Sequence, residues 1–326
     1  MNPFDTVSQE VMSTLAVVFP GQGSQSPGMG QAAAEAFPEA REVFEQADSV
    51  LGYPLSKICF EGPEEELRRT AVTQPAILTT SMALWSVLRQ RGVRPAMVAG
   101  HSLGEYSAIV AAGGLSLADA VTTVQLRGQL MQEAVPEGEG AMAAVLGLET
   151  AQVEMLCKEE ARGEVLTPAN YNAPGQIVVS GHVAAVERAV KAAGKLGALR
   201  AVRLPVSAPF HCQLMLPAQE KLQGHLQGLG FHDLQVPLVT NVDAEPVQSA
   251  DQVRDALIRQ VSSPVRWDLS MGRMVGQGMS RFLEVGPGKI LAGLLRRIDR
   301  SVSCTPVSDP KGVERAAQVL QTGETT

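Results

Sequence analysis

The sequence predicts an α/β protein: a large domain built on a mostly parallel sheet, with a second, smaller domain inserted into it. Two patterns support this fold class. Short apolar runs of strand type alternate with helical patterns both before residue 138 and after residue 205, which favours a parallel sheet with helices on both faces. Between these parts the expected order is strand, helix, strand, strand, helix, strand. That order is the ferredoxin-like arrangement.

The part before residue 138 begins with an apolar run, Leu15–Phe19, that predicts a strand. A glycine-rich loop follows this run from Pro20. A second apolar run at 95–99 predicts a strand that leads directly into a helix. The helical patterns of this part lie at about 28–50, 74–91, 105–112 and 117–135.

The inserted unit covers residues 139–204 and follows a linker rich in glycine and glutamate. Its strands are expected at 141–148, 165–171, 176–180 and 198–204, and its helices at 150–162 and 183–195. An inserted domain forms a cleft with the domain that carries it, and ligands usually bind in such clefts. The junction of the two domains is therefore the expected place of a site.

After the insertion the α/β alternation resumes. The patterns indicate helices near 214–228 and 249–261, strands at 236–241 and 281–285, and a final helix after the turn 286–288. We therefore expect one discontinuous large domain made of residues 12–138 and 205–310. Residues 1–11 and 311–326 are expected to be extensions, the second a weak helix with a frayed polar end.

Composition excludes several classes of protein. Of 326 residues 45% are hydrophobic and the net charge is −7, which fits a globular protein and argues against nucleic-acid binding. The four cysteines are far apart and form no CxxC pair, so we expect neither a metal site nor disulfides, and a reducing, cytoplasmic location. Residues 1–14 do not resemble a secretory signal, and no apolar run approaches 18 residues, so no membrane span is expected.

The most informative motif is Gly100-His101-Ser102-Leu103-Gly104, which lies between a predicted strand and a predicted helix. A Gly-x-Ser-x-Gly turn in this context places serine on a strained elbow with its hydroxyl uncrowded. The N-terminus of the new helix directs N–H groups at the place where an oxyanion would form. The alternative is a tight turn whose small residues serve packing alone.

A serine hydroxyl needs a base to become a nucleophile. His225 and His232 are expected at the surface, His182 in a turn, and His101 in local contacts. His211 differs because it follows the insertion directly, on the expected cleft wall, and comes after the serine, as in hydrolase-like α/β sheets. It is either the base or a buried or capping histidine. No acid partner is evident, and a backbone carbonyl could orient the imidazole instead.

Two further features border the expected site. Arg127 lies at the edge of the apolar stripe of the 117–135 helix, where its guanidinium either extends to water or reaches a buried anion such as a carboxylate. The loop 21–28 has neither the dinucleotide fingerprint nor the P-loop pattern. Its glycines are expected to bring backbone or Gln22 close to the elbow.

Taken together, these segments resemble the malonyl-CoA:acyl carrier protein transacylase family and, more broadly, the acyltransferase domains of fatty acid and polyketide synthases. The matching stretches run in order through most of the chain: 19–25, 74–75, 100–108, 127–128, 172–176, 209–211, 240–241, 263–267 and 284–288. The family fold is an α/β-hydrolase-like domain with a ferredoxin-like insertion. This agrees with the organisation expected from the patterns.

The resemblance implies a Ser-His pair. In it Ser102 is the acylated nucleophile and His211 the base, with the imidazole held by a carbonyl. Gln260 matches a glutamine near the pair and is expected to contribute to substrate binding. The backbone N–H groups of Gln22 and Leu103 match the oxyanion hole.

The resemblance also implies how substrate is selected. Arg127 matches the arginine that binds the free carboxylate of malonyl, and a plain acyl chain would gain nothing from a buried arginine. Phe210 resembles the bulky ring of malonyl-selective relatives, which crowds an α-methyl group. Asn172, in the matching stretch 172–176, is expected to contact substrate.

The implied substrates are malonyl-CoA and the phosphopantetheine thiol of acyl carrier protein, in a ping-pong reaction that needs no metal or redox cofactor. We expect a free-standing monomer that serves fatty acid synthesis, with polyketide synthesis as the alternative. Because carrier proteins are acidic and this chain is net negative, a local basic rim is expected. Its candidates are Arg200, Arg203 and Lys289.

Two other function classes stay open on the sequence. The same elbow would serve a thioester hydrolase, which would release its acyl group to water. A patatin-like hydrolase is disfavoured because the chain has no Asp-Gly dipeptide. The third hypothesis is a non-catalytic protein that binds the carrier protein.

Overall fold

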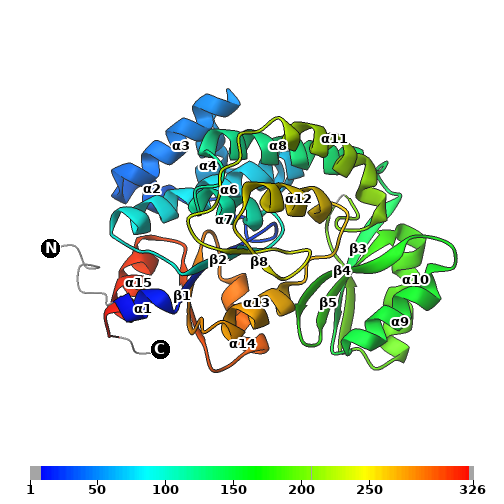
Figure 1. Ribbon diagram of the computed structural model, residues 1–326. Helices are drawn as coiled ribbons and strands as arrows, with labels where there is room; N and C mark the ends of the chain where they lie inside the picture. The colour runs from blue at the N-terminus through cyan, green and yellow to red at the C-terminus, as the bar shows by residue number, and fades with distance from the viewer. Residues whose placement is uncertain (1–8, 207, 323–326) are drawn as a thin grey trace.

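The computed structural model describes residues 9–206 and 208–322, and within them it contains a six-stranded and a four-stranded sheet (Figure 1). The larger sheet has the order β10-β9-β1-β2-β7-β8, and all its pairs are parallel except β7 with β8. Its strands are β1 Leu15–Phe19, β2 Met97–Gly100, β7 Leu238–Val239, β8 Pro246–Val247, β9 Arg281–Val285 and β10 Ser303–Val307. The predicted α/β fold class, with a mostly parallel sheet and an antiparallel insertion, is confirmed.

Strand β1 shows why this sheet needs helices on both faces. All five of its residues are buried, and successive side chains of a strand point to opposite faces. Leu15, Val17 and Phe19 enter one core, and Ala16 and Val18 enter another. The first core is covered by α3 (Pro38–Leu51), α6 (Thr70–Gln90) and α8 (Leu117–Glu133), and the second by α13 (Trp267–Gly276) and α14 (Ile290–Ile298).

The expected helix over 28–50 is two helices, α2 (Gln31–Ala36) and α3. Phe37 between them is extended, with φ −131° and ψ 117°, and Pro38 occupies the first turn of α3. Proline disfavours helical geometry in the residue before it but fits well at a helix start. The prediction of a single helix was therefore wrong, and Pro38 is the residue in the sequence that indicates the break.

Helix α6, with 21 residues, is long and apolar enough to be a candidate membrane span. No such helix was expected from the sequence. However, 89% of the 18-residue apolar stretch of α6 is buried inside the protein, as expected for the central helix of a folded core. Among the described residues this is the one helix that meets the length and composition criteria.

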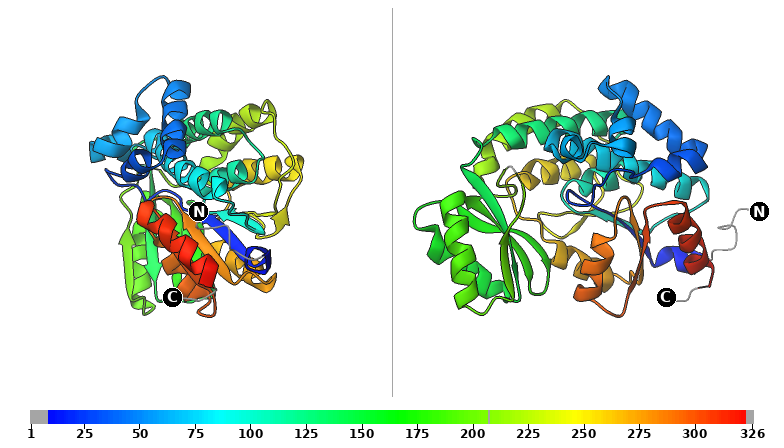
Figure 2. Two further views of the ribbon diagram at one scale, coloured as in Figure 1. Left: turned by 90° about the vertical axis from the view of Figure 1, so that its left-hand side faces the viewer. Right: turned by 180° about the vertical axis from the view of Figure 1, so that it is seen from behind.

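The inserted unit forms the second sheet, with the order β4-β5-β3-β6 and antiparallel pairs throughout. Its elements are β3 Gly140–Leu146, α9 Thr150–Ala161, β4 Leu166–Ala173, β5 Gln176–His182, α10 Val183–Lys195 and β6 Arg200–Arg203. The element order is the one expected from the sequence, with shifts of a few residues at the ends. Figures 1 and 2 show this unit at the end of the molecule opposite to the chain termini.

The C-terminal part differs most from expectation. Helix α13 and strand β10 were not predicted, and α15 (Pro310–Thr322) is part of the large domain rather than an extension. Its apolar face, which includes Val313, Ala316 and Leu320, is buried in the main core. The extension assigned to 311–326 was therefore wrong for residues 311–322. Residues 1–8 and 323–326 lie outside the described residues.

The remaining helices complete the large domain. They are α1 Gln9–Ser13, α4 Leu55–Glu61, α5 Glu64–Arg68, α7 Gly104–Ala111, α11 Leu216–Gln227 and α12 Ala250–Gln260, with a short 3₁₀ turn at Gln213–Met215. Helices α4 and α5 were not predicted. Of these helices, α7 and α12 bear directly on the site.

Candidate active site

Ser102 lies in the turn between β2 and α7, at the carboxyl end of the parallel strands. Its φ is +50°, a left-handed conformation that is uncommon for a residue with a side chain. The turn is tight because the chain packs on itself: a Cβ on Gly100 would lie 1.9 Å from the backbone of Gly104, and one on Gly104 would lie 2.1 Å from the carbonyl oxygen of Phe19. The glycines are therefore required by close approach, and the predicted elbow is present.

His211 approaches the serine from the segment of the large domain that follows the inserted unit. Its Nε2 lies 2.7 Å from Ser102 Oγ, although the two residues are 109 positions apart. Its Nδ1 lies 2.9 Å from the carbonyl oxygen of Gln260, so Nδ1 carries the proton and Nε2 is free to accept one. The His211 backbone also has a left-handed φ, +61°. Ser207, upstream in the same segment, lies outside the described residues.

Burial and a nearby positive charge keep this histidine neutral. His211 is 3% exposed, and burial, followed by the Arg127 guanidinium, lowers its pKa from 6.5 to about 3. A neutral imidazole at neutral pH can accept the serine proton. The geometry is that of a base paired with a nucleophile, with a backbone carbonyl where an acid often stands.

Asn241 holds the elbow from behind. Its Oδ1 accepts a hydrogen bond from the Ser102 N–H at 2.7 Å, and its Nδ2 donates to the Gly100 carbonyl at 2.7 Å. The side chain therefore satisfies both backbone groups that flank the bend. Sequence reasoning gave Asn241 no role, since neither contact has a local signal in the chain.

Arg127 is fully inside the protein, at 1% exposure, so the interpretation in which it extends to water was wrong. Its Nη1 donates to Gln74 Oε1, and its Nη2 donates to Gln260 Oε1, each at 2.8 Å. Nη2 also lies 3.2 Å from Ser102 Oγ. The guanidinium packs 5.7 Å from the centre of the Tyr106 ring, which favours a cation there. A buried cation thus adjoins the nucleophile.

A pocket of about 450 Å³ opens over these groups. Among its lining residues are Ser102, Arg127, His211, Phe210, Gln22 and Gln74. The backbone N–H groups of Gln22 and Leu103 have no hydrogen-bond acceptor among the described residues. Two such donors beside a nucleophile can stabilise a negatively charged oxygen.

Asn172 and His101 link the two domains at the edge of the pocket. The Oδ1 of Asn172, which belongs to β4, lies 2.8 Å from Nε2 of His101. His101 lines the pocket and packs against Trp267 with the two rings tilted by 59° and their centres 5.4 Å apart. The local role expected for His101 was therefore wrong, because its partner comes from the inserted unit. Asn170, rather than Asn172, lines the pocket.

The basic residues expected at the rim do not line this pocket. Arg200 and Arg203 are exposed on β6, an edge strand, and Arg203 lies 3.8 Å from Glu187. Lys289 lies in a separate groove beside α14. In the described part of the chain, no group of three or more histidine, cysteine, aspartate or glutamate side chains is arranged to hold a metal ion.

The comparisons agree with the geometry. The acyl transferase domain family matches residues 16–315. The chain is 48% identical over 309 residues to the malonyl CoA-acyl carrier protein transacylase of Escherichia coli strain K12, covering 94% of this chain and all of that protein.

Solved structures are also similar over nearly the whole chain. The malonyl CoA-acyl carrier protein transacylase of Coxiella burnetii matches with a TM-score of 0.93 at 43% identity. The match covers 94% of this chain and 98% of that one. A malonyl-transacylase solved in complex with its type II PKS acyl-carrier protein has a TM-score of 0.92 at 47% identity. That match covers 93% of this chain and 99% of the other. This chain is an acyltransferase and belongs to the malonyl CoA-acyl carrier protein transacylase family.

Proposed function

We propose that this chain transfers a malonyl group from malonyl-CoA to the phosphopantetheine thiol of an acyl carrier protein, through a malonyl ester on Ser102. The observation that carries the proposal is the buried Arg127 guanidinium, whose Nη2 lies 3.2 Å from Ser102 Oγ. A short diacid esterified there would bring its free carboxylate to this cation. The transfer supplies extender units for fatty acid synthesis, with polyketide synthesis as the alternative pathway.

In the first half-reaction, His211 Nε2 takes the Ser102 hydroxyl proton as Oγ attacks the thioester carbonyl carbon. The N–H groups of Gln22 and Leu103 stabilise the resulting oxyanion, each by about 2.7–4 kcal/mol in the transition state. The carbon–sulfur bond then breaks, and the coenzyme A sulfur takes the proton from His211. Malonyl remains on Ser102 as an ester.

In the second half-reaction, the phosphopantetheine thiol enters the pocket and gives its proton to His211 Nε2. The thiolate attacks the ester carbonyl carbon, the bond to Oγ breaks, and Oγ takes the proton back. The proposed reaction uses no metal or redox cofactor. The serine is free again for malonyl-CoA.

Three side chains contribute to acyl selectivity in this proposal. A charged hydrogen bond from Arg127 is worth about 1.5–3 kcal/mol, which corresponds to roughly 10- to 150-fold in favour of malonyl over acetyl. Phe210 is next to the base and lines the pocket, where its ring would crowd an α-methyl branch. Asn172 contributes by holding His101 at the edge of the pocket.

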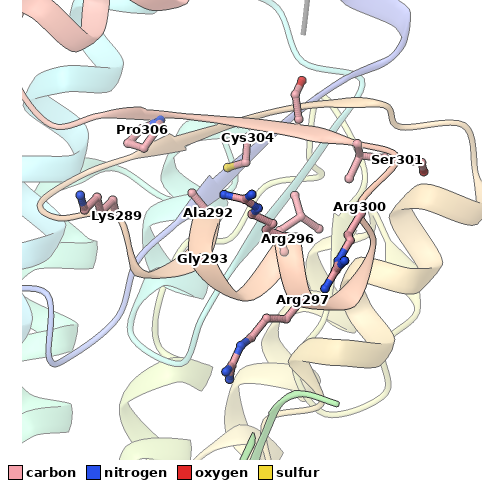
Figure 3. A pocket seen from close by; sticks show the side chains of 12 residues that line it. Lys289, Ala292, Gly293, Arg296, Arg297, Arg300, Ser301, Cys304 and Pro306 are labelled. Atoms are coloured by element: carbon pink, nitrogen blue, oxygen red, sulfur yellow. The ribbon is translucent and has the colours of Figure 1, made fainter. Parts of the chain in front are cut away.

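We assign carrier-protein docking to a basic groove of about 1030 Å³ beside α14. Lys289 was a sequence candidate, and the structure adds Arg296, Arg297 and Arg300 (Figure 3). All four are exposed, and none forms an ion pair with a carboxylate of the described residues. Arg297 donates to Gln176 Oε1 of the inserted unit at 2.7 Å.

The groove begins next to the active-site pocket. Gly288, adjacent to Lys289, packs against Ser24, and the same loop supplies Gln22 and Gln25 to the pocket wall. An acidic carrier protein on this groove would place its prosthetic group close to Ser102. Arg200 and Arg203 on β6 stay candidates for a second contact from the inserted unit.

Charge reversal tests the docking assignment. The variant R296E/R300E is expected to accept malonyl from malonyl-CoA normally but to deliver it to carrier protein more slowly at low salt, because opposite charges steer association. The variant R200E/R203E tests β6 in the same assay. Unchanged delivery rates in both at low ionic strength contradict the assignment.

We also propose that the chain acts as a monomer in the cytoplasm. In support, Cys59, Cys157 and Cys212 are free thiols buried in the protein, which suits a reducing compartment. Light scattering on the purified protein measures the oligomeric state. A mass of twice 34.5 kDa would contradict the monomer.

Intact-mass spectrometry tests the proposed function. Wild type incubated with malonyl-CoA is expected to gain one malonyl group, which holo carrier protein then removes. S102A should gain none. S107A should still gain the malonyl group, because Ser107 is buried on α7 and has no hydrogen-bond partner among the described residues. An adduct that water removes equally fast without carrier protein indicates a hydrolase, and binding without any adduct indicates a non-catalytic binder.

A further inference from the structure

Behind the elbow lies a buried carboxylate that the proposed reaction does not use. Glu105 is the second residue of α7 and is 1% exposed. One of its oxygens accepts a hydrogen bond from the Asn241 backbone N–H at 3.0 Å, and the other accepts from Gln260 Nε2 at 2.5 Å. Both bonds run to residues that hold the site together.

Gln260 connects this carboxylate to the substrate side. Its Nε2 donates to Glu105 and to the Ser102 carbonyl oxygen, while its Oε1 accepts from Arg127 Nη2. The amide therefore has a donor end that faces two acceptors and an acceptor end that faces a donor. Gln260 is itself fully buried, so water cannot replace a lost partner.

We propose that Glu105 is a positioning residue for acyl selectivity, which fixes the Gln260 amide and through it holds the Arg127 guanidinium facing the substrate carboxylate. The proposal rests on the proposed function, because it assumes an acyl group that carries a carboxylate. Glu105 does not touch the reacting atoms. Its influence passes through one amide whose two ends cannot be exchanged.

The direction of the hydrogen bonds makes the carboxylate irreplaceable by an amide. The Asn241 backbone N–H can only donate, so a glutamine at position 105 must turn its oxygen toward it and its NH₂ toward Gln260. Gln260 would then either face NH₂ with NH₂ or rotate and present its own NH₂ to Arg127. Arginine is a donor only. Either arrangement breaks a buried hydrogen bond on the path to Arg127.

The charge of Glu105 suits the same role. Within the described part of the chain, the buried Arg127 cation has no carboxylate in direct contact, and Glu105 is the acid that lies one amide away. Burial raises the pKa of Glu105 to about 7, and its bonds to Asn241 and Gln260 and the charge of Arg127 oppose that rise. Its place in the first turn of α7 also favours a negative charge.

The test compares a substrate that needs Arg127 with one that does not. E105Q and E105D are assayed for malonyl transfer from malonyl-CoA and for acylation by p-nitrophenyl acetate, whose acetyl group has no carboxylate. In E105Q we expect KM for malonyl-CoA to rise about tenfold, as for one weakened charge-assisted hydrogen bond. Acylation by the acetate ester should change little. E105D keeps the charge but is too short to reach both partners. Like E105Q, it should therefore raise KM for malonyl-CoA and change acylation by the acetate ester little.

E284Q is the matched control. Glu284 is also fully buried and also accepts two N–H bonds, from Leu291 and Ala292, but it has no hydrogen bond to Gln260 or Arg127. It should lower the melting temperature without separating the two activities. Equal losses of both activities in E105Q, or the same separation in E284Q, overturn the proposal. If wild type itself forms no malonyl ester, the proposed function fails instead, and the positioning role falls with it.

Discussion

Asn241 and Ser102 are joined by a hydrogen bond of 2.7 Å from the serine N–H to the asparagine side chain, across 139 residues of sequence. The same side chain donates to Gly100 on the other side of the bend. Ser102 keeps its unfavourable φ of +50° because both backbone groups around it are satisfied from outside the turn. The nucleophile is thus positioned by a residue that has no chemical step of its own.

Replacing Asn241 by alanine is expected to destabilise the protein by about 1–3 kcal/mol, since it leaves two buried backbone groups without partners. The turnover number should fall as well, because the serine loses its fixed position. Thermal unfolding and steady-state kinetics measure the two effects. S249A is the comparison: it removes the N-cap of α12, at a cost of about 0.5–2 kcal/mol, and should leave turnover unchanged. Normal turnover in N241A would contradict the role given to Asn241.

Replacing Arg127 by methionine should reverse acyl preference while keeping much of the buried volume. We expect kcat/KM for malonyl-CoA to fall by roughly 10- to 150-fold relative to acetyl-CoA. R188M is a matched variant, because Arg188 also makes several hydrogen bonds but lies in the inserted unit away from the pocket. A selectivity ratio that stays constant in R127M would exclude carboxylate recognition by this arginine.

The pH dependence of serine acylation should lack an ordinary histidine titration. Because the pKa of His211 is lowered to about 3, the imidazole stays neutral and active well below pH 6.5. Acylation by p-nitrophenyl acetate against pH measures this. R127M should move the acid limb upward, since it removes the positive charge that is the second cause of the lowered pKa. An inflection near 6.5 in wild type would contradict the prediction.

The same shift links stability to pH. In the unfolded chain His211 binds a proton below about 6.5, whereas in the folded protein it does so only near 3. The folded state therefore binds fewer protons between these values. The contribution of His211 to stability is full above pH 6.5 and is lost as the pH falls toward 3. The free energy of unfolding of wild type and H211Q, measured with denaturant across this pH range, isolates the contribution of His211.

Replacing Gly104 by alanine should disrupt the elbow, because the new Cβ would lie 2.1 Å from the Phe19 carbonyl oxygen. A backbone shift is then unavoidable, and we expect the free energy of unfolding to fall by about 4 kcal/mol. G272A is the control. Gly272 is exposed within α13 and has open space around it, so alanine should stabilise the helix by about 1 kcal/mol. Equal melting temperatures of the two variants would refute the packing argument.

Replacing Phe210 by alanine should relax the limit on branched acyl groups. The variant is expected to raise kcat/KM for methylmalonyl-CoA relative to malonyl-CoA by an amount equivalent to about 1–3 kcal/mol, the usual value of one methyl group in a pocket. Competition between the two thioesters in one transfer assay measures the ratio directly. No change would show that another side chain sets the limit.

Much of the fold could be predicted because its signals are local. The five buried residues of β1 and the elbow between β2 and α7 are contiguous patterns. Strand β10 was missed because Pro306 argues against a central strand, and the structure places it at the sheet edge where proline is tolerated. Helix α13 was missed because it contains glycine at position 272, which lowers helix propensity.

The nucleophile, its histidine and the arginine could be proposed from the sequence because each is a chemically distinctive residue in a recognisable context. Glu105 and Asn241 could not, since their importance lies in contacts with residues more than a hundred positions away. Gln74 is a similar case: only the folded chain shows that its side-chain Oε1 accepts a hydrogen bond from Arg127. The roles of such side chains have no local sequence signal and can be recognised only when the folded structure shows their distant partners.

The acceptor that orients His211 is the backbone carbonyl of Gln260. Any residue type at this position would still provide that carbonyl, as long as the backbone keeps its place. A scan in which each side chain is truncated in turn would therefore report a dyad and leave the third partner undetected. Exchange of the amide after Gln260 for an ester would expose it, since an ester carbonyl is a weaker acceptor. Substitutions of the Gln260 side chain can therefore test its contacts with Glu105 and Arg127 without removing the carbonyl that orients the base.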